Sequence, residues 1–174
     1  FSSKQFVKAK IEDLLGREEI KLSESKIKES INDKVVLVTG AAGSIGSGLV
    51  KQIANFKPKL VILFDQAESA LYDLQWDLKD EVPELNYDIV IGDVTHKIRV
   101  RILIKSFRPQ IIFHAAAYKH VHLMELNPSE AVKTNVLGTK ILADISVEFN
   151  VEKFIFISTD KAVNPTNVMG ATKR

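Results

Sequence analysis

The chain has 174 residues, of which 45% are hydrophobic and 26% charged, and it contains no cysteine. This length fits one domain with a buried core, and the composition is that of a soluble globular protein, without disulfides or thiolate catalysis. Its 24 basic and 22 acidic side chains are interleaved along the sequence, so there is no basic stripe of the kind that nucleic-acid binding needs.

The first 33 residues are dominated by Lys, Glu and Ser, and they predict an arm of one or two short helices. Apolar residues with helical spacing stand at Val7, Ile11 and Leu14. Gly16 is placed to end that helix, and a second short helix is expected through Ile27 and Ile31. We therefore divide the chain into a helical arm or solvated linker, residues 1–33, and a folded domain, residues 34–174.

Five short β-rich segments alternate with helical stretches in the folded domain. The predicted strands are Val35–Thr39, Leu60–Asp65, Tyr87–Ile91, Gln110–His114 and Lys153–Ser158. The apolar residues with helical spacing between them are Ile45, Leu49 and Ile53, then Leu71, Leu74 and Leu78, then Val94, Ile98 and Ile102. Apolar strands joined by helices indicate a parallel sheet covered on both faces. The predicted fold is α/β, a doubly wound parallel sheet of the Rossmann type with a short helical N-terminal arm.

The loop after the first predicted strand has the Gly-x-x-Gly-x-x-Gly spacing of a dinucleotide-binding turn. Gly40 permits a tight turn, Gly43 lets the backbone approach a pyrophosphate, and Gly46 lets the following helix pack closely on the strand. A simple tight strand-to-helix turn is the alternative. The cofactor-binding residues predicted in this loop are Gly40, Ala42, Gly43, Ser44, Ile45 and Gly46.

A carboxylate at the end of the second predicted strand favours NAD over NADP as the cofactor. Asp65 can accept both hydroxyls of the adenine ribose and would repel a 2′-phosphate, although it could instead cap the next helix. Asp93 is placed to accept from the adenine amino group or to cap the helix after it. The other predicted cofactor contacts are Val94, Ala115, Ala116, Ala117, Asn135 and Lys173. The three alanines leave room for a cofactor to lie against the backbone.

Asn135 lies in the buried stripe of a predicted helix. Pro128 and Glu130 stand at the first and third positions of that helix, behind a cap at Asn127. The buried stripe is Ala131, Asn135, Gly138, Leu142, Ile145 and Phe149. Because a buried amide must be hydrogen-bonded, Asn135 either ties down a loop or holds the active-site backbone and a water molecule.

The fifth predicted strand leads into Thr159, Asp160 and Lys161, at the edge where a nicotinamide ring should lie. Removing water from a sugar requires an acid for the departing hydroxyl and a base for a weakly acidic carbon. Asp160 and Lys161 can supply these if neighbouring groups shift their pKa values. The alternative is a capped turn with a surface ion pair.

Met169 and Lys173 are four residues apart on a predicted helix and share a face, where Lys173 can hold the nicotinamide ribose. Many enzymes of this architecture have a proton-accepting tyrosine where Met169 stands, and methionine cannot do that work. Proton removal would then fall to Thr159 or Asp160 through water.

These motifs resemble those of the extended short-chain dehydrogenases/reductases and, within that group, the polysaccharide-biosynthesis nucleotide-sugar 4,6-dehydratases. The stretches that carry the resemblance are Val35–Leu49, Phe64–Tyr72, His114–Val121, Asn127–Gly138 and Ile157–Arg174. The resemblance implies a UDP-N-acetylglucosamine 4,6-dehydratase with tightly held NAD, which oxidises carbon 4, removes water across carbons 5 and 6 and returns hydride to carbon 6. Gly48 departs from the family's usual glutamate, and His122 from its usual proline.

The resemblance also implies a role for each residue of the predicted catalytic set. Lys161 would abstract the carbon 5 proton, Asp160 would protonate the leaving hydroxyl, and Thr159 would bind the carbon 4 oxygen. Lys173 would hold the ribose, and Met169 in the tyrosine position is typical of the large members. The residues expected near the substrate are Lys119 and His120. No metal ligand is predicted.

The resemblance sets expectations for partners and location. A UDP-sugar is the expected partner, nucleic acid and membrane contact by these residues are not expected, and the full-length protein is expected to be a cytoplasmic homo-oligomer. Ile11–Arg17 resembles the stretch before the catalytic domain of large membrane-anchored members, so upstream segments could hold a longer parent protein at the inner face of the cell membrane. The substrate-binding half is expected downstream of Arg174, and the chain alone is not expected to turn over.

Two other functions compete with the dehydratase. One is an NAD-dependent 4-epimerase or simple dehydrogenase acting on a nucleotide sugar, and neither of those reactions eliminates water. The other is a non-catalytic sensor that only binds NAD and a partner.

Overall fold

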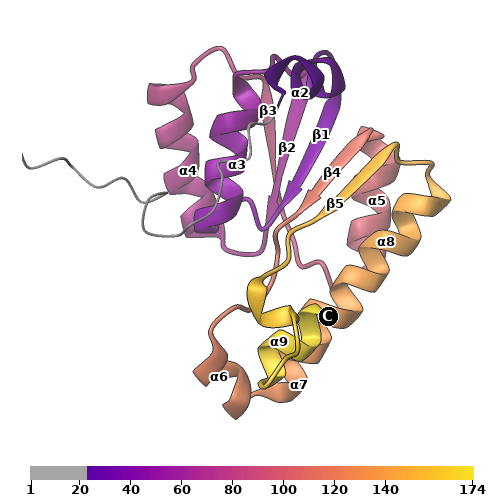
Figure 1. Ribbon diagram of the computed structural model, residues 1–174. Coiled ribbons are helices and arrows are strands. Elements are labelled where there is room, and N and C mark those ends of the chain that lie inside the picture. The colour runs from indigo at the N-terminus through magenta and orange to yellow at the C-terminus, as the bar shows by residue number, and fades with distance from the viewer. Residues whose placement is uncertain (1–22) are drawn as a thin grey trace, which may run out of the picture.

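The computed structural model describes residues 23–174, so the helix predicted around Val7 and Leu14 lies outside the described residues. Five strands form one parallel sheet in the order β3-β2-β1-β4-β5, with helices on both faces (Figure 1). The strands are β1 Val35–Thr39, β2 Leu60–Asp65, β3 Tyr87–Ile91, β4 Ile111–His114 and β5 Lys153–Phe156. The helices are α2 Glu24–Ile31, α3 Ser44–Ala54, α4 Glu68–Glu81, α5 Lys97–Phe107, α6 Val121–Leu126, α7 Pro128–Ala131, the π-helix η1 Val132–Gly138, α8 Thr139–Glu148, the 3-10 turn η2 Asp160–Ala162 and α9 Val168–Lys173. This strand order is that of the Rossmann fold, and the predicted fold class is confirmed.

The register of the sheet brings the carboxyl ends of its strands to one edge. Thr39 at the end of β1 pairs with Phe64 of β2 and with His114 of β4, and His114 pairs with Phe156 at the end of β5. The β5 strand stops at Phe156, two residues before the predicted end, although the N–H of Ile157 still donates to the carbonyl of His114. Helices α6, α7 and α9 gather beyond this edge (Figure 1).

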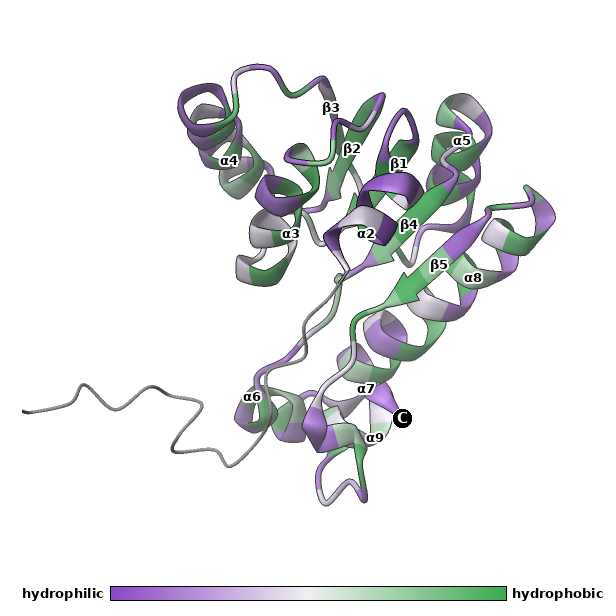
Figure 2. Ribbon diagram, turned by 45° about the horizontal axis from the view of Figure 1, so that its top comes forward, coloured by the Kyte–Doolittle hydropathy of each residue, from purple (hydrophilic) through white to green (hydrophobic). Residues whose placement is uncertain are grey.

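The core consists of two apolar layers, one on each face of the sheet. Val36 and Val38 of β1 pack toward α3 and α4, and Leu37 between them packs toward α5 and α8. Because both faces are covered, a central strand is apolar along its whole length rather than at every second residue. The green of β1, β2 and β4 in Figure 2 follows this pattern.

Helix α3 departs from its predicted buried face at one residue, and α5 departs at two. In α3, Ile53 is buried and Leu49 packs against the core, as predicted, whereas Ile45 in the first turn is 54% exposed. In α5, Ile98 and Ile102 are exposed, because Val94 lies before the helix and a non-helical turn breaks the helical spacing between Val94 and Ile98. The residues that α5 buries are Val100, Leu103 and Ile104. The predicted face of α4 is confirmed, with Leu71, Leu74 and Leu78 buried.

The segment from α7 through η1 to α8 buries the predicted stripe. Its buried members are Ala131, Asn135, Gly138, Leu142 and Ile145, with Phe149 partly buried against them. The predicted N-cap residue is in the expected position, but its side chain does not cap the helix. Asn127 stands before α7, but its Nδ2 donates to the carbonyl of Leu123 in α6 and makes no side-chain cap.

Helix α2 packs on the domain, unlike the solvated linker expected for residues 1–33. Ile31 is buried and Ile27 packs against the same apolar layer as α3 and α4. Lys153 of β5 also donates to Ser30 of α2. The second helix predicted for the arm therefore forms and contributes to the core.

Gly48 lies on the exposed face of α3, with no atom within 4 Å of the position that a Cβ would take. Replacing Gly48 with alanine should raise the free energy of unfolding by about 0.5–1 kcal/mol, because glycine costs that much inside a helix. Urea denaturation measures the change. Gly46→Ala is the matched control and should destabilise, since its Cβ would collide with the carbonyl of Gly40. A Gly48→Ala variant no more stable than the original would contradict the prediction.

Candidate functional site

The β1–α3 loop is built on close contacts between main-chain atoms. Gly40 has a φ of 69°, and a Cβ there would collide with the main chain of Ala116 beyond β4. Gly46 lies against the carbonyl of Gly40, so helix and strand meet without an intervening side chain. No side chain caps α3, whose first residue follows Gly43. The start of α3 therefore offers main-chain N–H groups and the positive end of its dipole to an anion.

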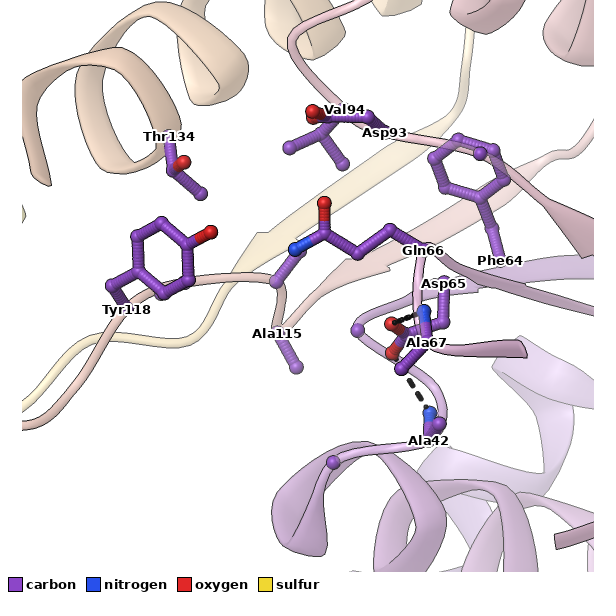
Figure 3. Close-up of a pocket in the computed structure, with 15 residues that line it drawn as sticks. Ala42, Phe64, Asp65, Gln66, Ala67, Asp93, Val94, Ala115, Tyr118 and Thr134 are labelled. Carbon is purple, nitrogen blue, oxygen red and sulfur yellow. Dashed lines mark hydrogen bonds between the residues drawn. The ribbon is translucent and has the colours of Figure 1, made fainter. Parts of the chain in front are cut away.

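Asp65 supports this loop from the end of β2. Its Oδ2 accepts the N–H of Ala42 and its Oδ1 accepts the N–H of Ala67, each at 3.0 Å (Figure 3). Helix α4 begins at Glu68, so Asp65 is not its N-cap, and the capping alternative is not realised. Each carboxylate oxygen has taken one main-chain donor and keeps lone-pair capacity for a ligand hydroxyl.

A first cavity of about 250 Å³ lies beside Asp65. Its lining residues are Gly40, Ala42, Gly43, Phe64, Asp65, Gln66, Ala67, Gly92, Asp93, Val94, Ala115, Ala116, Ala117, Tyr118 and Thr134. The Oδ1 of Asp93 accepts the N–H of Thr95 at 2.7 Å, whereas α5 is capped by His96, so Asp93 holds the turn and does not cap the helix. Gly138 makes room for Val94, because a Cβ at 138 would lie 2.8 Å from the Cγ2 of Val94.

A second cavity of about 420 Å³ adjoins the first, and the two share five lining residues. Its lining residues are Gly40, Gly43, Ser44, Ile45, Gly46, Ala115, Ala117, Tyr118, Lys119, His120, Ile157, Ser158, Thr159, Lys161, Met169 and Lys173. The two cavities form one groove along the carboxyl edge of the sheet. Of the predicted site residues, Asn135 and Asp160 line neither cavity.

Charge is divided along this groove. The first cavity is lined by two carboxylates, Asp65 and Asp93, and by no lysine or arginine. The second is lined by Lys119, Lys161 and Lys173 and by no carboxylate, and the Nζ of Lys119 lies 3.3 Å from the Oγ of Ser44 at the start of α3. The groove therefore suits a long ligand with hydroxyl or amino donors at one end and negative charge further along.

Asn135 acts as a clamp between two segments that border the groove. It is 1% exposed; its Oδ1 accepts the N–H of Tyr118, and its Nδ2 donates to the carbonyl of Tyr118 and to the Oγ1 of Thr172 in α9. Both hydrogens of the amide are thus used within the protein. Of the two roles expected from the sequence, the structure shows the tying down of a loop. We call these three hydrogen bonds the Asn135 clamp.

Lys173 is a buried cation that faces the second cavity. It is 9% exposed, and its Nζ lies 4.1 Å from the centre of the Phe156 ring. No carboxylate of residues 23–174 forms an ion pair with it. Burial lowers the pKa of Lys173 to about 8. Its ammonium hydrogens are therefore left to donate to a ligand. A ligand that accepts them would offset the cost of burying a charge without partners.

Thr159, Asp160 and Lys161 form a capped turn with an exposed ion pair. Thr159 Oγ1 accepts the N–H of Lys161 at 3.4 Å and donates to Asp160 Oδ1 at 2.9 Å, and Lys161 Nζ lies 3.2 Å from that same oxygen. The hydrogen bond from Thr159 and the contact with Lys161 lower the pKa of Asp160, whose side chain is 85% exposed. A general acid needs the opposite shift. In this chain Asp160 is the ionised partner of Lys161.

The family whose description is "Polysaccharide biosynthesis protein" matches residues 36–174. The chain belongs to this family. It is 46% identical to the capsular polysaccharide biosynthesis protein CapD of Staphylococcus aureus over 168 residues, which cover 96% of this chain and 28% of CapD. It is 38% identical to a UDP-N-acetylglucosamine 4,6-dehydratase (inverting) of Campylobacter jejuni over 143 residues, 82% of this chain and 41% of that protein.

A solved structure shows the same fold. The UDP-glucose 4-epimerase of Brucella ovis in complex with NAD has a TM-score of 0.68 and 26% identity, over 80% of this chain and 44% of that one. The chain therefore spans less than half the length of each of these three proteins.

In this member of the polysaccharide biosynthesis family, eight residues that line the groove were not among the predicted site residues: Phe64, Gln66, Ala67, Gly92, Tyr118, Thr134, Ile157 and Ser158. Tyr118 lines both cavities, and Gln66 and Thr134 line the first (Figure 3). Gln66 directly follows Asp65 and Tyr118 directly follows the alanine run, so their place after strand ends was a usable signal. Thr134 sits beside Asn135 in η1, and nothing in an apolar stripe points to it.

Residues 23–174 contain neither a candidate membrane span nor a candidate metal site. No helix in this range is both long and apolar enough to cross a membrane. No group of three or more His, Cys, Asp or Glu side chains in this range is arranged so that it could hold a metal ion.

Replacing Lys173 with methionine should change how stability depends on pH. The unfolded chain keeps this proton up to about pH 10.5 and the folded chain only up to about 8, so folding is penalised below pH 8 and gains stability as the pH rises from 8 to 10.5. The variant should be more stable than the original at pH 7 and should lack that rise. Urea denaturation across this pH range measures both effects, with exposed Lys105→Met as the control. Parallel stability curves for Lys173→Met and the original chain would contradict the assigned shift.

Proposed function

We propose that this chain is the NAD-binding part of a nucleotide-sugar 4,6-dehydratase, with UDP-N-acetylglucosamine as its substrate. The observation that carries the proposal is the convergence of Thr159, Lys161, Met169 and Lys173 on the cavity that borders the glycine loop. The 38% identity to a protein named as a UDP-N-acetylglucosamine 4,6-dehydratase supports the same activity and substrate. Residues 34–174, with α2 packed against them, would form the cofactor domain.

The residues present fit NAD. The first cavity would take the adenosine, with Asp65 accepting from the ribose hydroxyls and Asp93 from the adenine amino group. The pyrophosphate would lie at the start of α3, against the backbone that the glycines leave open. Lys173 would hold the second ribose with the donors that it does not use within the described chain. When bound, NAD would accept a hydride from the sugar and later return it.

The elimination of water would be shared by Asp160 and Lys161. Lys161 Nζ would take the proton from carbon 5 of the oxidised sugar, and Asp160 would give a proton to the hydroxyl that leaves carbon 6. The base must be an uncharged amine and the acid an uncharged carboxyl. In the exposed turn the pair carries both charges instead.

Transfer of one proton between the two side chains would prepare both groups at once. Moving a proton from Lys161 Nζ to Asp160 Oδ1, across 3.2 Å, turns the ion pair into an amine and a carboxylic acid without changing the net charge. Water favours the charged forms. A substrate that covers the turn would remove water from both groups and so favour the neutral forms.

The residues around the pair have supporting roles. Thr159 lies in the second cavity, and its hydroxyl, which now donates to Asp160, would turn to the oxygen on carbon 4. Met169 is 3% exposed and fills the tyrosine position without a proton to exchange. The proton from the carbon 4 hydroxyl would therefore leave through Thr159 to water, because Asp160 already holds the proton that it received from Lys161. Lys119 and the start of α3 would meet phosphate groups.

A 4-epimerase is the second candidate, because the Brucella ovis protein with the same fold carries that name. Epimerisation needs hydride removal and return at carbon 4 and no acid for a leaving hydroxyl. The Asp160–Lys161 pair beside the cavity favours the elimination. A protein that only binds NAD would have no use for either group.

Calorimetry should show that the chain binds NAD more tightly than NADP. Asp65→Asn should weaken NAD binding by about tenfold, since a hydrogen bond to a charged group contributes ~1.5–3 kcal/mol, and should narrow the preference over NADP. Asp93→Asn, in the same cavity but away from the ribose, is the control and should leave the NAD/NADP ratio unchanged. Tighter binding of NADP by the original chain would refute the role given to Asp65.

In the full-length protein, incubation with UDP-N-acetylglucosamine should give a 4-keto-6-deoxy product, detected by mass spectrometry as loss of one water. Lys161→Ala should lower kcat by roughly 10²–10⁴-fold, the range that acid–base catalysis contributes, while NAD binding stays unchanged. Lys105→Ala, an exposed lysine on α5, is the control. An epimerised sugar of unchanged mass would support the second candidate, and unchanged turnover by Lys161→Ala would remove Lys161 from the chemistry.

A further inference from the structure

His114 is a fully buried polar side chain that the proposed chemistry does not use. It ends β4, is 0% exposed and lines neither cavity. Its Nδ1 lies 2.6 Å from the Oγ1 of Thr39 at the end of β1, and its Nε2 lies 2.9 Å from the Oγ1 of Thr139 at the start of α8. The ring therefore bridges the end of β1 and the start of α8.

The hydrogen bonds around His114 fix where its proton lies. The Oγ1 of Thr139 donates its one hydrogen to the carbonyl of Asn135 at 2.6 Å, so toward His114 it can only accept. The Nε2 of His114 must then carry the hydrogen, and the Nδ1 of the neutral ring accepts from the hydroxyl of Thr39. Burial and the positive charge of Lys173 lower the pKa of His114 to about 3, which keeps the ring neutral.

This chain of hydrogen bonds joins the two sides of the groove. Thr39 directly precedes Gly40, at the start of the glycine loop. At the other end, the carbonyl that accepts from Thr139 belongs to Asn135, whose side chain forms the clamp on Tyr118 and Thr172. This series of hydrogen bonds therefore runs from Thr39, beside the glycine loop, to Asn135, which is hydrogen-bonded to Thr172 of α9.

We propose that His114 is a positioning residue of the dinucleotide site, whose neutral ring, donating on one side and accepting on the other, fixes the glycine loop relative to the Asn135 clamp. The test of this role measures NAD binding, so the proposal rests on the proposed function in that respect. The role requires one donor and one acceptor on opposite sides of a neutral side chain. A glutamine amide provides the same pair, and leucine provides neither.

The test compares His114→Gln, His114→Leu and Thr139→Val in the full chain by NAD calorimetry. His114→Leu and Thr139→Val should each weaken NAD binding by about tenfold, the double variant should be no weaker than either single one, and His114→Gln should stay within about twofold of the original. The matched control is Ser146→Ala. Ser146 is a buried hydroxyl on α8 that donates to a carbonyl four residues back, as Thr139 does, but it does not contact His114. This control should lose stability and keep its affinity for NAD.

A second readout does not need the cofactor. Hydrogen exchange at the N–H of Tyr118, which the Asn135 clamp protects, should be faster in His114→Leu than in His114→Gln or Ser146→Ala. Long-range proton–nitrogen NMR spectra should show hydrogen on Nε2 of His114 in the original chain.

Equal NAD affinity for His114→Leu and the original chain, or a His114→Gln variant as weak as His114→Leu, would overturn the positioning role. Hydrogen on Nδ1 would overturn it as well. If the original chain failed to bind NAD, the proposed function would fall. The exchange rate at Tyr118 and the site of the His114 hydrogen would then decide whether the bridge itself exists.

Discussion

The contact of main chain with main chain at Gly40 is the constraint on which the groove depends. The β1–α3 loop touches the backbone after β4 there, and Gly46 brings α3 against the same turn. Any side chain at either position would push the start of α3 away from the sheet edge. The anion site, the support from Asp65 and the continuity of the two cavities all require that closeness. The parallel register brings the loops after the strands to the same edge, because β1, β2, β4 and β5 end at neighbouring positions.

Charge in the groove follows the same division as the elements that build it. The carboxylates stand at the end of β2 and after β3, and the lysines stand after β4, after β5 and on α9. Burial acts unequally on these lysines. Lys173 loses its solvent and lies on the Phe156 ring, whereas Lys161 stays half exposed beside a carboxylate. One cation is thus ready to bind a ligand, and the other depends on what covers it.

The sequence predicted the sheet well because a strand covered on both faces leaves a continuous apolar run, as in Val35–Thr39 and Leu60–Asp65. It also predicted the residues that follow the strands, since topology alone brings them together. It placed Ile98 and Ile102 wrongly because the start of α5 depends on a turn that Asp93 and His96 stabilise. The ionised state of Asp160 depends on side-chain geometry, and spacing does not encode it. His114 gave no signal, because its partner Thr39 is 75 residues away and Thr139 is 25.

The groove draws its parts from widely separated places in the chain, and this sets the order in which they can form during synthesis. The cavity with carboxylates needs β1 to β3, the alanines after β4 and the residues around Thr134. The cavity with lysines needs α9 as well, because Met169 and Lys173 stand there and Thr172 completes the Asn135 clamp. A nascent chain would thus complete the cavity with carboxylates first and the cavity with lysines last. Until α9 emerges from the ribosome, only the first of the two cavities would have all of its lining residues.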